Sequence, residues 1–125
     1  MNKDAKATIL VVEDDPHMRH LLKIILEKNL YKVIEANDGD EALACLKKSS
    51  DIALIVTDIK MPQRDGMELL KTTVEKYPDV KVILITAFGE MEQYLDAMNM
   101  GAFEYLNKPF KNQQLLDMVK LALKS

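Results

Sequence analysis

The sequence predicts an α/β fold, a doubly wound (βα)5 arrangement in which a five-stranded parallel sheet carries helices on both faces. Five short apolar runs alternate along the 125 residues with five longer amphipathic stretches, as expected for repeated strand–helix units. The apolar runs are rich in Val and Ile, and several are apolar at nearly every position, which is typical of parallel strands buried on both faces. The length suits one domain.

The local sequence also indicates where the elements lie. The five strands are expected at residues 8–12, 32–36, 52–56, 80–85 and 103–106. The first helix is expected to start at Pro16, where a missing N–H has no cost and where Asp15 can cap the helix. Asp38 and Glu41 have the spacing of a capping box and predict the start of the second helix.

Apolar residues at helical spacing predict the face of each helix that packs on the sheet. The expected stripes are Met18, Leu21, Leu22 and Ile25 in the first helix, Leu43 and Leu46 in the second, Met67, Leu70, Val74 and Tyr77 in the third, Met91, Tyr94, Leu95 and Met98 in the fourth, and Leu115, Val119 and Ala122 in the fifth. Pro78 is expected to stop the third helix, and a left-handed Gly101 is expected to end the fourth.

The composition excludes several classes of protein. With 17 Lys and Arg against 20 Asp and Glu, the chain lacks the cationic excess of a general nucleic-acid binder. The single cysteine, Cys45, cannot form an internal disulfide or a multi-cysteine zinc site, which suits a reducing compartment. No apolar stretch approaches the ~18 residues that a membrane helix needs. We therefore expect a cytoplasmic domain that binds neither a membrane nor nucleic acid directly.

Polar residues follow four of the five expected strands. Glu13 and Asp14 follow the first strand, Asp58 follows the third, Thr86 follows the fourth and Lys108 follows the fifth. In doubly wound sheets, ligands bind outside the carboxyl ends of the strands, where the strand order reverses. If the first and third strands are neighbours, as in the order 2-1-3-4-5, the three carboxylates converge in one pocket.

Such a pocket has a defined chemistry. Three adjacent carboxylates need a compensating positive charge, and Mg²⁺ prefers oxygen ligands of this kind. Lys108 can add a second positive charge that meets an anion. A carboxylate can attack phosphorus, and phosphoryl transfer mainly requires positioning and charge neutralisation. The chain has no GxGxxG or GxxxxGK[ST] motif and no evident Ser–His–Asp arrangement, so dinucleotide, ATP-loop and serine-nucleophile sites are unsupported.

Four motifs carry a resemblance to a known family. The run ILVVEDD, the segment TDIKMPQRDG, the pair Thr86–Ala87 and the stretch GAFEYLNKPF are similar to motifs of the receiver domain of bacterial two-component response regulators. The resemblance covers essentially the whole chain. It implies a flavodoxin-like fold with strand order 2-1-3-4-5 and a single receiver domain over residues 1–125, with no output domain in this chain.

The resemblance also implies a role for each matching residue. Asp58 resembles the phosphorylated aspartate, and Thr86, Lys108 and the backbone N–H of Ala87 resemble the groups that contact the phosphoryl group. The implied Mg²⁺ ligands are Glu13, Asp14, Asp58 and the backbone carbonyl of Lys60. Glu13 departs from the more usual Asp and would hold the metal largely through water.

The resemblance implies three further structural features. Tyr105 resembles the switch aromatic that turns inward when Thr86 moves. Gly66 resembles the turn glycine that opens the third helix, and the Lys108–Pro109 bond is implied to be cis.

The implied function is that of a phosphoacceptor switch in a phosphorelay. Asp58 would take a phosphoryl group from a histidine kinase or a phosphotransfer protein in a Mg²⁺-dependent reaction. The change at Thr86 and Tyr105 would alter the surface of the fourth helix, fifth strand and fifth helix, which regulates a partner or a fused output domain and is a candidate homodimer interface. The only reactions that the domain would catalyse are phosphotransfer to its own aspartate and autodephosphorylation. The stretch TAFGEME…AMNMGAFEYLNKPF looks most like receivers attached to sigma-54-dependent transcription activators and also resembles some stand-alone regulators.

Two other functions compete with this interpretation. A Mg²⁺-dependent hydrolase with an aspartyl intermediate typically needs an acid two residues after the nucleophile, where this chain has Lys60. An interaction module that has lost phosphorylation would not need the set Asp14, Asp58, Thr86 and Lys108, all of which are present.

Individual residues have alternative interpretations as well. Tyr105 could serve only core packing. His17 and His20 are expected on a solvated helix surface, because two histidines without a third ligand form a poor metal site. Cys45 is expected to be a small buried hydrophobe. An apolar patch of His17, Met18, Leu21 and Phe110 is a candidate docking site for the kinase, although Met18 and Leu21 could instead belong to the core.

Overall fold

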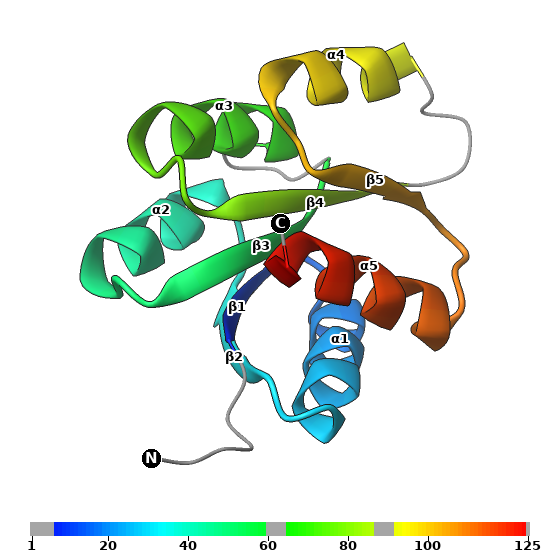
Figure 1. The fold of residues 1–125 in the computed structure, drawn as a ribbon. Helices are drawn as coiled ribbons and strands as arrows, with labels where there is room; N and C mark the ends of the chain where they lie inside the picture. The colour runs from blue at the N-terminus through cyan, green and yellow to red at the C-terminus, as the bar shows by residue number, and fades with distance from the viewer. Residues whose placement is uncertain (1–6, 60–64, 87–91, 125) are drawn as a thin grey trace.

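The computed structural model describes residues 7–59, 65–86 and 92–124. Strands and helices alternate in the described ranges as the sequence predicts (Figure 1). The elements are β1 (Thr8–Val12), α1 (Pro16–Lys28), β2 (Lys32–Ala36), α2 (Gly39–Lys48), β3 (Ile52–Asp58), α3 (Gly66–Lys76), β4 (Lys81–Thr86), α4 (Glu92–Met100), β5 (Glu104–Asn107) and α5 (Asn112–Lys124). The third strand is two residues longer than expected, and the last two strands are shifted by one residue.

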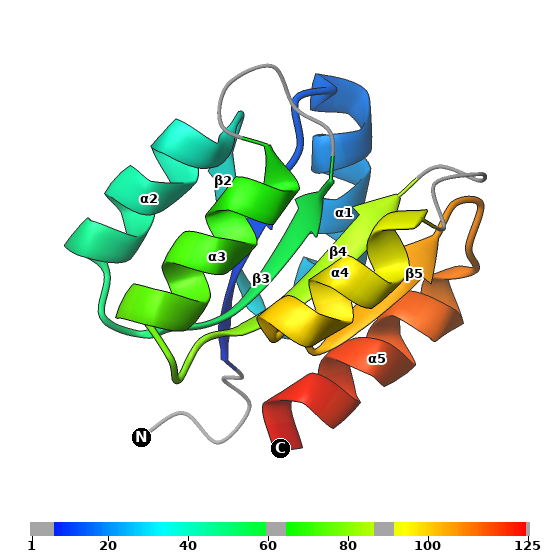
Figure 2. The same cartoon turned by 90° about the horizontal axis from the view of Figure 1, so that it is seen from above.

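The strands form one parallel sheet in the order β2-β1-β3-β4-β5, which confirms the predicted flavodoxin-like topology. Figure 2 shows α2, α3 and α4 on one face of the sheet and α1 and α5 on the other. In the central pair, Val12 of β1 lies opposite Thr57 of β3. The residues that directly follow these two strands therefore emerge at the same edge of the sheet.

Alternation along the strands divides the core into two layers. In β1, Leu10 and Val12 join the core under α2, α3 and α4, whereas Ile9 and Val11 join the core under α1 and α5. All four side chains are fully buried. A strand buried on both faces has no polar position, which is why the sequence reads as a continuous apolar run.

The helix starts follow the expected capping chemistry. The side chain of Asp15 accepts a hydrogen bond from the N–H of His17 at 2.9 Å, with Pro16 in the first helical position. Asp38 accepts from the N–H of Glu41 at 2.9 Å, and the Glu41 carboxylate accepts from the N–H of Asn37 at 2.5 Å. These bonds satisfy N–H groups that have no partner within the helix.

In two helices, one residue of the predicted buried stripe lies at the surface, whereas Leu70 of α3 is buried and Met98 of α4 packs against the core. In α3, Val74 is 36% exposed, and Thr73 takes the buried position instead. The Thr73 hydroxyl donates to the carbonyl of Leu69 at 2.8 Å, so the polar group is satisfied in the core. In α4, Leu95 is 67% exposed, whereas the small Ala97 is buried against the sheet.

The other predicted stripes are confirmed in large part. Leu115, Val119 and Ala122 of α5 are buried, and α1 buries Leu22 and Ile25. Leu21 is the exception in α1, with half of its surface exposed, because the buried face is completed by Leu26. Met91 and the side chain of Tyr94 lie outside the described residues. Among the helices that the structure describes, none is long and apolar enough to cross a lipid bilayer.

Two glycines are required for different reasons. Gly101 follows α4 with φ +107°, the left-handed conformation expected from the sequence. Gly66 opens α3, as predicted, and lies against the end of β3: a Cβ there would be 2.4 Å from the carbonyl oxygen of Asp58 and 2.7 Å from the Cα of Ile59. Its N–H donates to the carbonyl of Ile59 at 2.8 Å. Gly66 therefore sets how closely α3 approaches the backbone of Asp58.

Substitution of Gly66 by Ala is expected to lower the free energy of unfolding by about 2 kcal/mol, because the added methyl group overlaps with backbone that cannot move alone. Urea denaturation measures this change. Gly101→Ala is the matched control, expected to cost about 1 kcal/mol mainly through its positive φ, because the added Cβ would meet only the side chain of Val74, at 3.1 Å, and no backbone. Equal stability of the two variants would contradict the close-approach argument.

Candidate functional site

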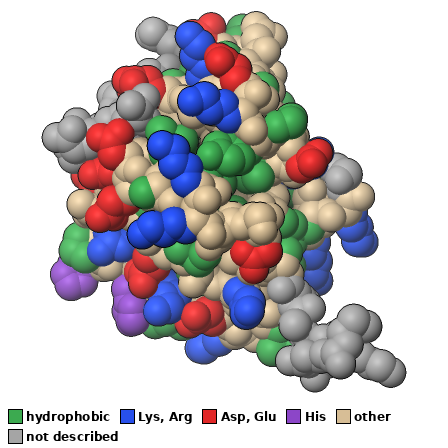
Figure 3. Space-filling model, turned by 90° about the vertical axis from the view of Figure 1, so that its left-hand side faces the viewer, with side chains coloured by type: hydrophobic (Ala, Val, Ile, Leu, Met, Phe, Trp, Pro, Cys, Tyr) green, Lys and Arg blue, Asp and Glu red, His purple; other side chains and the backbone are tan. Residues whose placement is uncertain are grey.

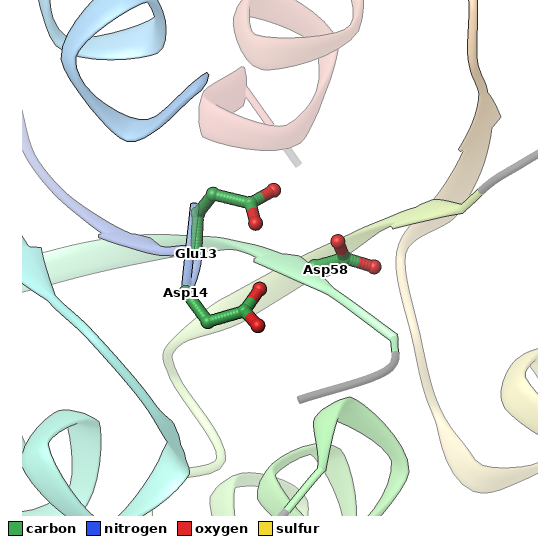
Figure 4. Close-up of side chains that lie close together, drawn as sticks. All are labelled: Glu13, Asp14 and Asp58. Carbon is green, nitrogen blue, oxygen red and sulfur yellow. The ribbon is translucent and has the colours of Figure 1, made fainter. Parts of the chain in front are cut away.

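The acidic residues predicted to converge lie together at the carboxyl edge of the sheet. Glu13 and Asp14 directly follow β1, and Asp58 is the last residue of the adjacent strand β3. Their carboxylate oxygens lie within 4.8 Å of one another. In Figure 4, the side chains of Glu13 and Asp14 extend toward the side on which Asp58 lies. The predicted convergence is therefore confirmed.

The three carboxylates differ in their surroundings. Glu13 is only 3% exposed, and its Oε2 accepts a hydrogen bond from the N–H of Asp15 at 3.0 Å. Asp58 is half-buried and Asp14 is exposed. The cluster thus has a buried side formed by Glu13 and an open side at Asp14, through which a small ion can reach all three groups.

Lys108, which directly follows β5, lies beside the same cluster. Its Nζ lies 3.3 Å from Oδ2 of Asp58 and 3.5 Å from Oε1 of Glu13. Its backbone N–H donates to the carbonyl of Thr86 at 2.7 Å, which ties the end of β5 to the end of β4. The Lys108–Pro109 peptide bond is cis, as the resemblance implied.

The electrostatics of the site follow from burial and crowding. Burial raises the pKa of Glu13 to about 7; the N–H of Asp15 and the ammonium of Lys108 oppose the rise, and Asp14 and Asp58 add to it. Burial by itself would lower the pKa of Lys108. The carboxylates of Asp58 and Glu13 together have a larger, opposite effect, so the pKa of Lys108 is raised. Lys108 can neutralise only one of three carboxylates, so ionisation of the whole cluster favours a bound cation.

The donor set fits a hard divalent cation. Three carboxylate side chains converge on one point, the cluster offers oxygen ligands only, and the open side leaves room for water ligands. This composition suits Mg²⁺ better than a transition metal that prefers nitrogen or sulfur. The backbone carbonyl of Lys60, the fourth implied ligand, lies outside the described residues, as does the N–H of Ala87.

The two residues expected to form the switch lie on one face of the sheet. Thr86 is the buried last residue of β4. Tyr105 of β5 pairs with Leu84, two residues before Thr86, so the side chains of Leu84 and Thr86 share a face. Tyr105 is buried in the core beneath α2, α3 and α4, which places the aromatic side chain inward in this structure.

The remaining predicted residues have surface or packing positions. His17 and His20 are exposed, and Cys45 is partly buried and packs against the core, as expected. Met18, Leu21 and Phe110 line a groove of about 460 Å³ between α1 and the start of α5. Leu22, Ile25, Lys108, Pro109 and Asn112 complete its lining. His17, the fourth member of the predicted patch, is not among them.

One residue at this edge escaped the sequence analysis. Arg19 of α1 donates from Nη1 to the backbone carbonyl of Glu13 at 2.6 Å. A bond to a backbone carbonyl requires no particular side chain at the accepting position. The only signal in the sequence was a cation on the first helix, six residues after Glu13.

Comparison with known proteins agrees with this geometry. A sequence model described as the response regulator receiver domain matches residues 9–120. The chain belongs to this family. The transcriptional regulatory protein DctD for C4-dicarboxylate transport, from Pseudomonas aeruginosa, is 39% identical over 96% of the chain. CpxR, a transcriptional regulatory protein of Escherichia coli K12, is 35% identical over 93% of it.

Solved structures of receiver domains have the same fold. A response regulator receiver domain protein from Clostridium thermocellum superimposes with a TM-score of 0.91 at 32% identity, over 95% of each chain. This chain spans only 26% of the length of DctD and 49% of that of CpxR. Receiver domains are signalling switches rather than classical enzymes, and the acidic cluster of this receiver is able to hold a metal ion.

The raised pKa of Glu13 predicts a pH-dependent stability of the metal-free receiver. Between pH 4.5 and about 7, folded Glu13 keeps a proton that the unfolded chain releases. Its contribution to stability is therefore complete below pH 4.5 and is lost as the pH rises to 7. Glu13→Gln cannot ionise, so it should be more stable than the native chain above pH 7, by about 1–2 kcal/mol, and similar at pH 4.5.

Urea unfolding in the presence of a chelator measures this difference across the pH range. Mg²⁺ should narrow the difference at pH 8, because the cation stabilises the ionised native cluster. A stability difference that does not change between pH 4.5 and pH 8 would contradict the buried-acid argument.

Proposed function

We propose that this receiver is the phosphoacceptor switch of a two-component phosphorelay, in which Asp58 takes a phosphoryl group from a histidine kinase or a phosphotransfer protein. The position of the Asp58 carboxylate is the observation that supports this proposal most directly. It lies within 4.8 Å of the oxygens of Glu13 and Asp14 and 3.3 Å from the ammonium of Lys108. A nucleophile between a cation-binding cluster and a lysine is the arrangement that phosphoryl transfer requires.

The proposed step exchanges one bond to phosphorus for another. A carboxylate oxygen of Asp58 attacks phosphorus and forms an acyl phosphate, while the bond from phosphorus to the donor imidazole breaks and its electron pair returns to nitrogen. Lys108 meets the phosphoryl oxygens. The Thr86 hydroxyl and the backbone N–H of Ala87 are assigned to the same oxygens.

The proposed metal is Mg²⁺, held by Glu13, Asp14, Asp58 and the backbone carbonyl of Lys60. When bound, it neutralises charge on the transferring group. Autodephosphorylation, in which water attacks the same phosphorus, is the only other reaction proposed.

The signal is proposed to leave the site through Thr86 and Tyr105. Phosphorylation draws the hydroxyl of Thr86 toward the new anion, and Tyr105, on the same face of the sheet, responds to the space that this movement changes. The affected surface consists of α4, β5 and α5, where Leu95 and Leu121 are exposed. Exposed leucines on adjacent elements support a partner protein, an output domain or a second receiver as the binding partner.

The domain boundaries and the location are part of the same proposal. Residues 1–125 are assigned to a single receiver domain, and the response is assigned to a partner protein or an output domain. The greater length of DctD and CpxR supports an output domain. A cytoplasmic location is proposed, where the phosphohistidine donor would meet the receiver.

Incubation with Mg²⁺ and acetyl phosphate is expected to add one phosphoryl group, detected by intact-protein mass spectrometry and located by peptide mapping at Asp58. Asp58→Asn should remain unmodified, and a chelator should prevent the reaction in the native chain. Asp51→Asn is the matched control, because Asp51 is exposed beside the opposite end of β3. Modification that persists in Asp58→Asn would refute the assignment.

The groove beside the site is proposed to receive the phosphohistidine donor. It borders Lys108, and its apolar lining includes Leu21, which is half exposed. Leu21→Ala is expected to slow transfer from the phosphorylated donor about tenfold, equivalent to about 1.4 kcal/mol, with the rate from acetyl phosphate unchanged.

Leu95→Ala is the control for this prediction, since it removes an even more exposed leucine from α4. It should leave both rates at the native value. A normal rate of transfer from the donor to Leu21→Ala would exclude the groove as the docking site.

A further inference from the structure

Arg19 connects three parts of the structure next to the acidic cluster. Its side chain is 20% exposed. Nη1 donates to the backbone carbonyl of Glu13 at 2.6 Å and lies 3.4 Å from Oδ1 of Asn37, while Nε lies 3.4 Å from Oε1 of Glu35. The guanidinium of an α1 residue thus contacts the segment after β1, strand β2 and the segment after β2.

The orientation of Arg19 is itself supported. The other oxygen of the Glu35 carboxylate lies 3.5 Å from Nζ of Lys23, one turn further along α1. Glu35 therefore lies between two cations of the same helix and holds Arg19 toward the sheet. Ion pairs that are partly exposed to water contribute little stability, so the main effect of this group is on geometry.

The carbonyl that Arg19 contacts belongs to the peptide unit between two of the proposed metal ligands. A peptide unit is planar, so the carbonyl of Glu13 and the N–H and Cα of Asp14 rotate together. The N–H of Glu13 is already fixed by the carbonyl of Ala36, at 3.1 Å, as part of the sheet. Fixing the Glu13 carbonyl then sets the direction in which the Glu13 side chain leaves the backbone and the position of the Asp14 Cα, from which the second carboxylate extends.

We infer that Arg19 is a positioning residue for the divalent-cation site, because its guanidinium holds the Glu13–Asp14 peptide plane in the orientation that directs both carboxylates at one point. This inference rests on the proposed Mg²⁺ site. A positioning role and simple electrostatics predict opposite changes in cation affinity when Arg19 is removed. Removing a cation beside an acidic cluster should strengthen cation binding by Coulomb's law, whereas loss of positioning weakens it.

The test is the Mg²⁺ affinity of the full chain, measured by isothermal titration calorimetry at physiological ionic strength, where distant charges are screened. Arg19→Ala is expected to bind Mg²⁺ about tenfold more weakly, the lower range for loss of a group that holds metal ligands in place. Lys23→Ala is the matched control: it removes the other cation paired with Glu35 and leaves the Glu13 carbonyl bonded. Its Mg²⁺ affinity should equal or slightly exceed that of the native chain.

Arg19→Lys keeps the positive charge, and it tests the same role if Arg19→Ala does not fold. One ammonium cannot replace both Nη1 at the Glu13 carbonyl and Nε at Glu35, so Mg²⁺ binding should still weaken, by about threefold. The amide NMR signal of Asp14 should shift in both Arg19 variants and remain in place in Lys23→Ala. At saturating Mg²⁺, labelling of Asp58 in Arg19→Ala by acetyl phosphate should return to the native level.

The outcomes separate this inference from the proposed function. Native-like Mg²⁺ affinity in Arg19→Ala or in Arg19→Lys would overturn the positioning role and leave the phosphoacceptor assignment standing. A native chain that binds Mg²⁺ but is not labelled at Asp58 would overturn the phosphoacceptor assignment, while the affinities of the variants still decide the role of Arg19. A native chain that binds no Mg²⁺ would overturn both.

Discussion

Mutual repulsion among three carboxylates is the constraint on which the site depends. The pairing of β1 with β3 brings Glu13, Asp14 and Asp58 to one edge of the sheet, and no rearrangement of side chains alone can separate residues that follow adjacent parallel strands. The protein moderates the repulsion in two ways. Burial keeps Glu13 protonated until near neutral pH, and Lys108 pairs with Asp58. Even with these two effects, additional positive charge stabilises the ionised cluster.

Because these charged residues must stay close together, main-chain contacts around the site hold each of them in place. Gly66 lets α3 approach the carbonyl of Asp58, the N–H of Lys108 bonds to Thr86, and the N–H of Asp15 bonds to the Glu13 carboxylate. Each contact fixes a charged residue through main-chain geometry. On the face shown in Figure 3, both basic and acidic side chains lie at the surface. The concentration of charge at the strand ends is therefore a local property that the net charge of −3 does not reveal.

The order of elements and the convergence of the site residues could be predicted from the sequence because both depend on local patterns. Continuous apolar runs mark buried parallel strands, and the residues that follow such strands must share an edge. The exposure of Val74 in α3 and of Leu95 in α4 could not be predicted, because apolar residues lie on more than one side of each helix. There the choice depends on tertiary detail: the hydroxyl of Thr73 has a carbonyl to bond, and Ala97 is small enough for close packing. Arg19 was missed because its partner is a backbone carbonyl, which no sequence pattern encodes.

The first turns of α1 combine two duties on two neighbouring sides of one helix. Arg19 faces the peptide unit between Glu13 and Asp14, whereas Met18, its neighbour in the chain, lines the apolar groove. A ligand of the groove and a ligand of the acidic cluster would thus both contact residues anchored on a single rigid segment. If binding of one ligand changes the affinity for the other through that segment, the reciprocal change has the same magnitude. A substitution in these turns is therefore assigned by measuring docking and ion binding separately on the same variant.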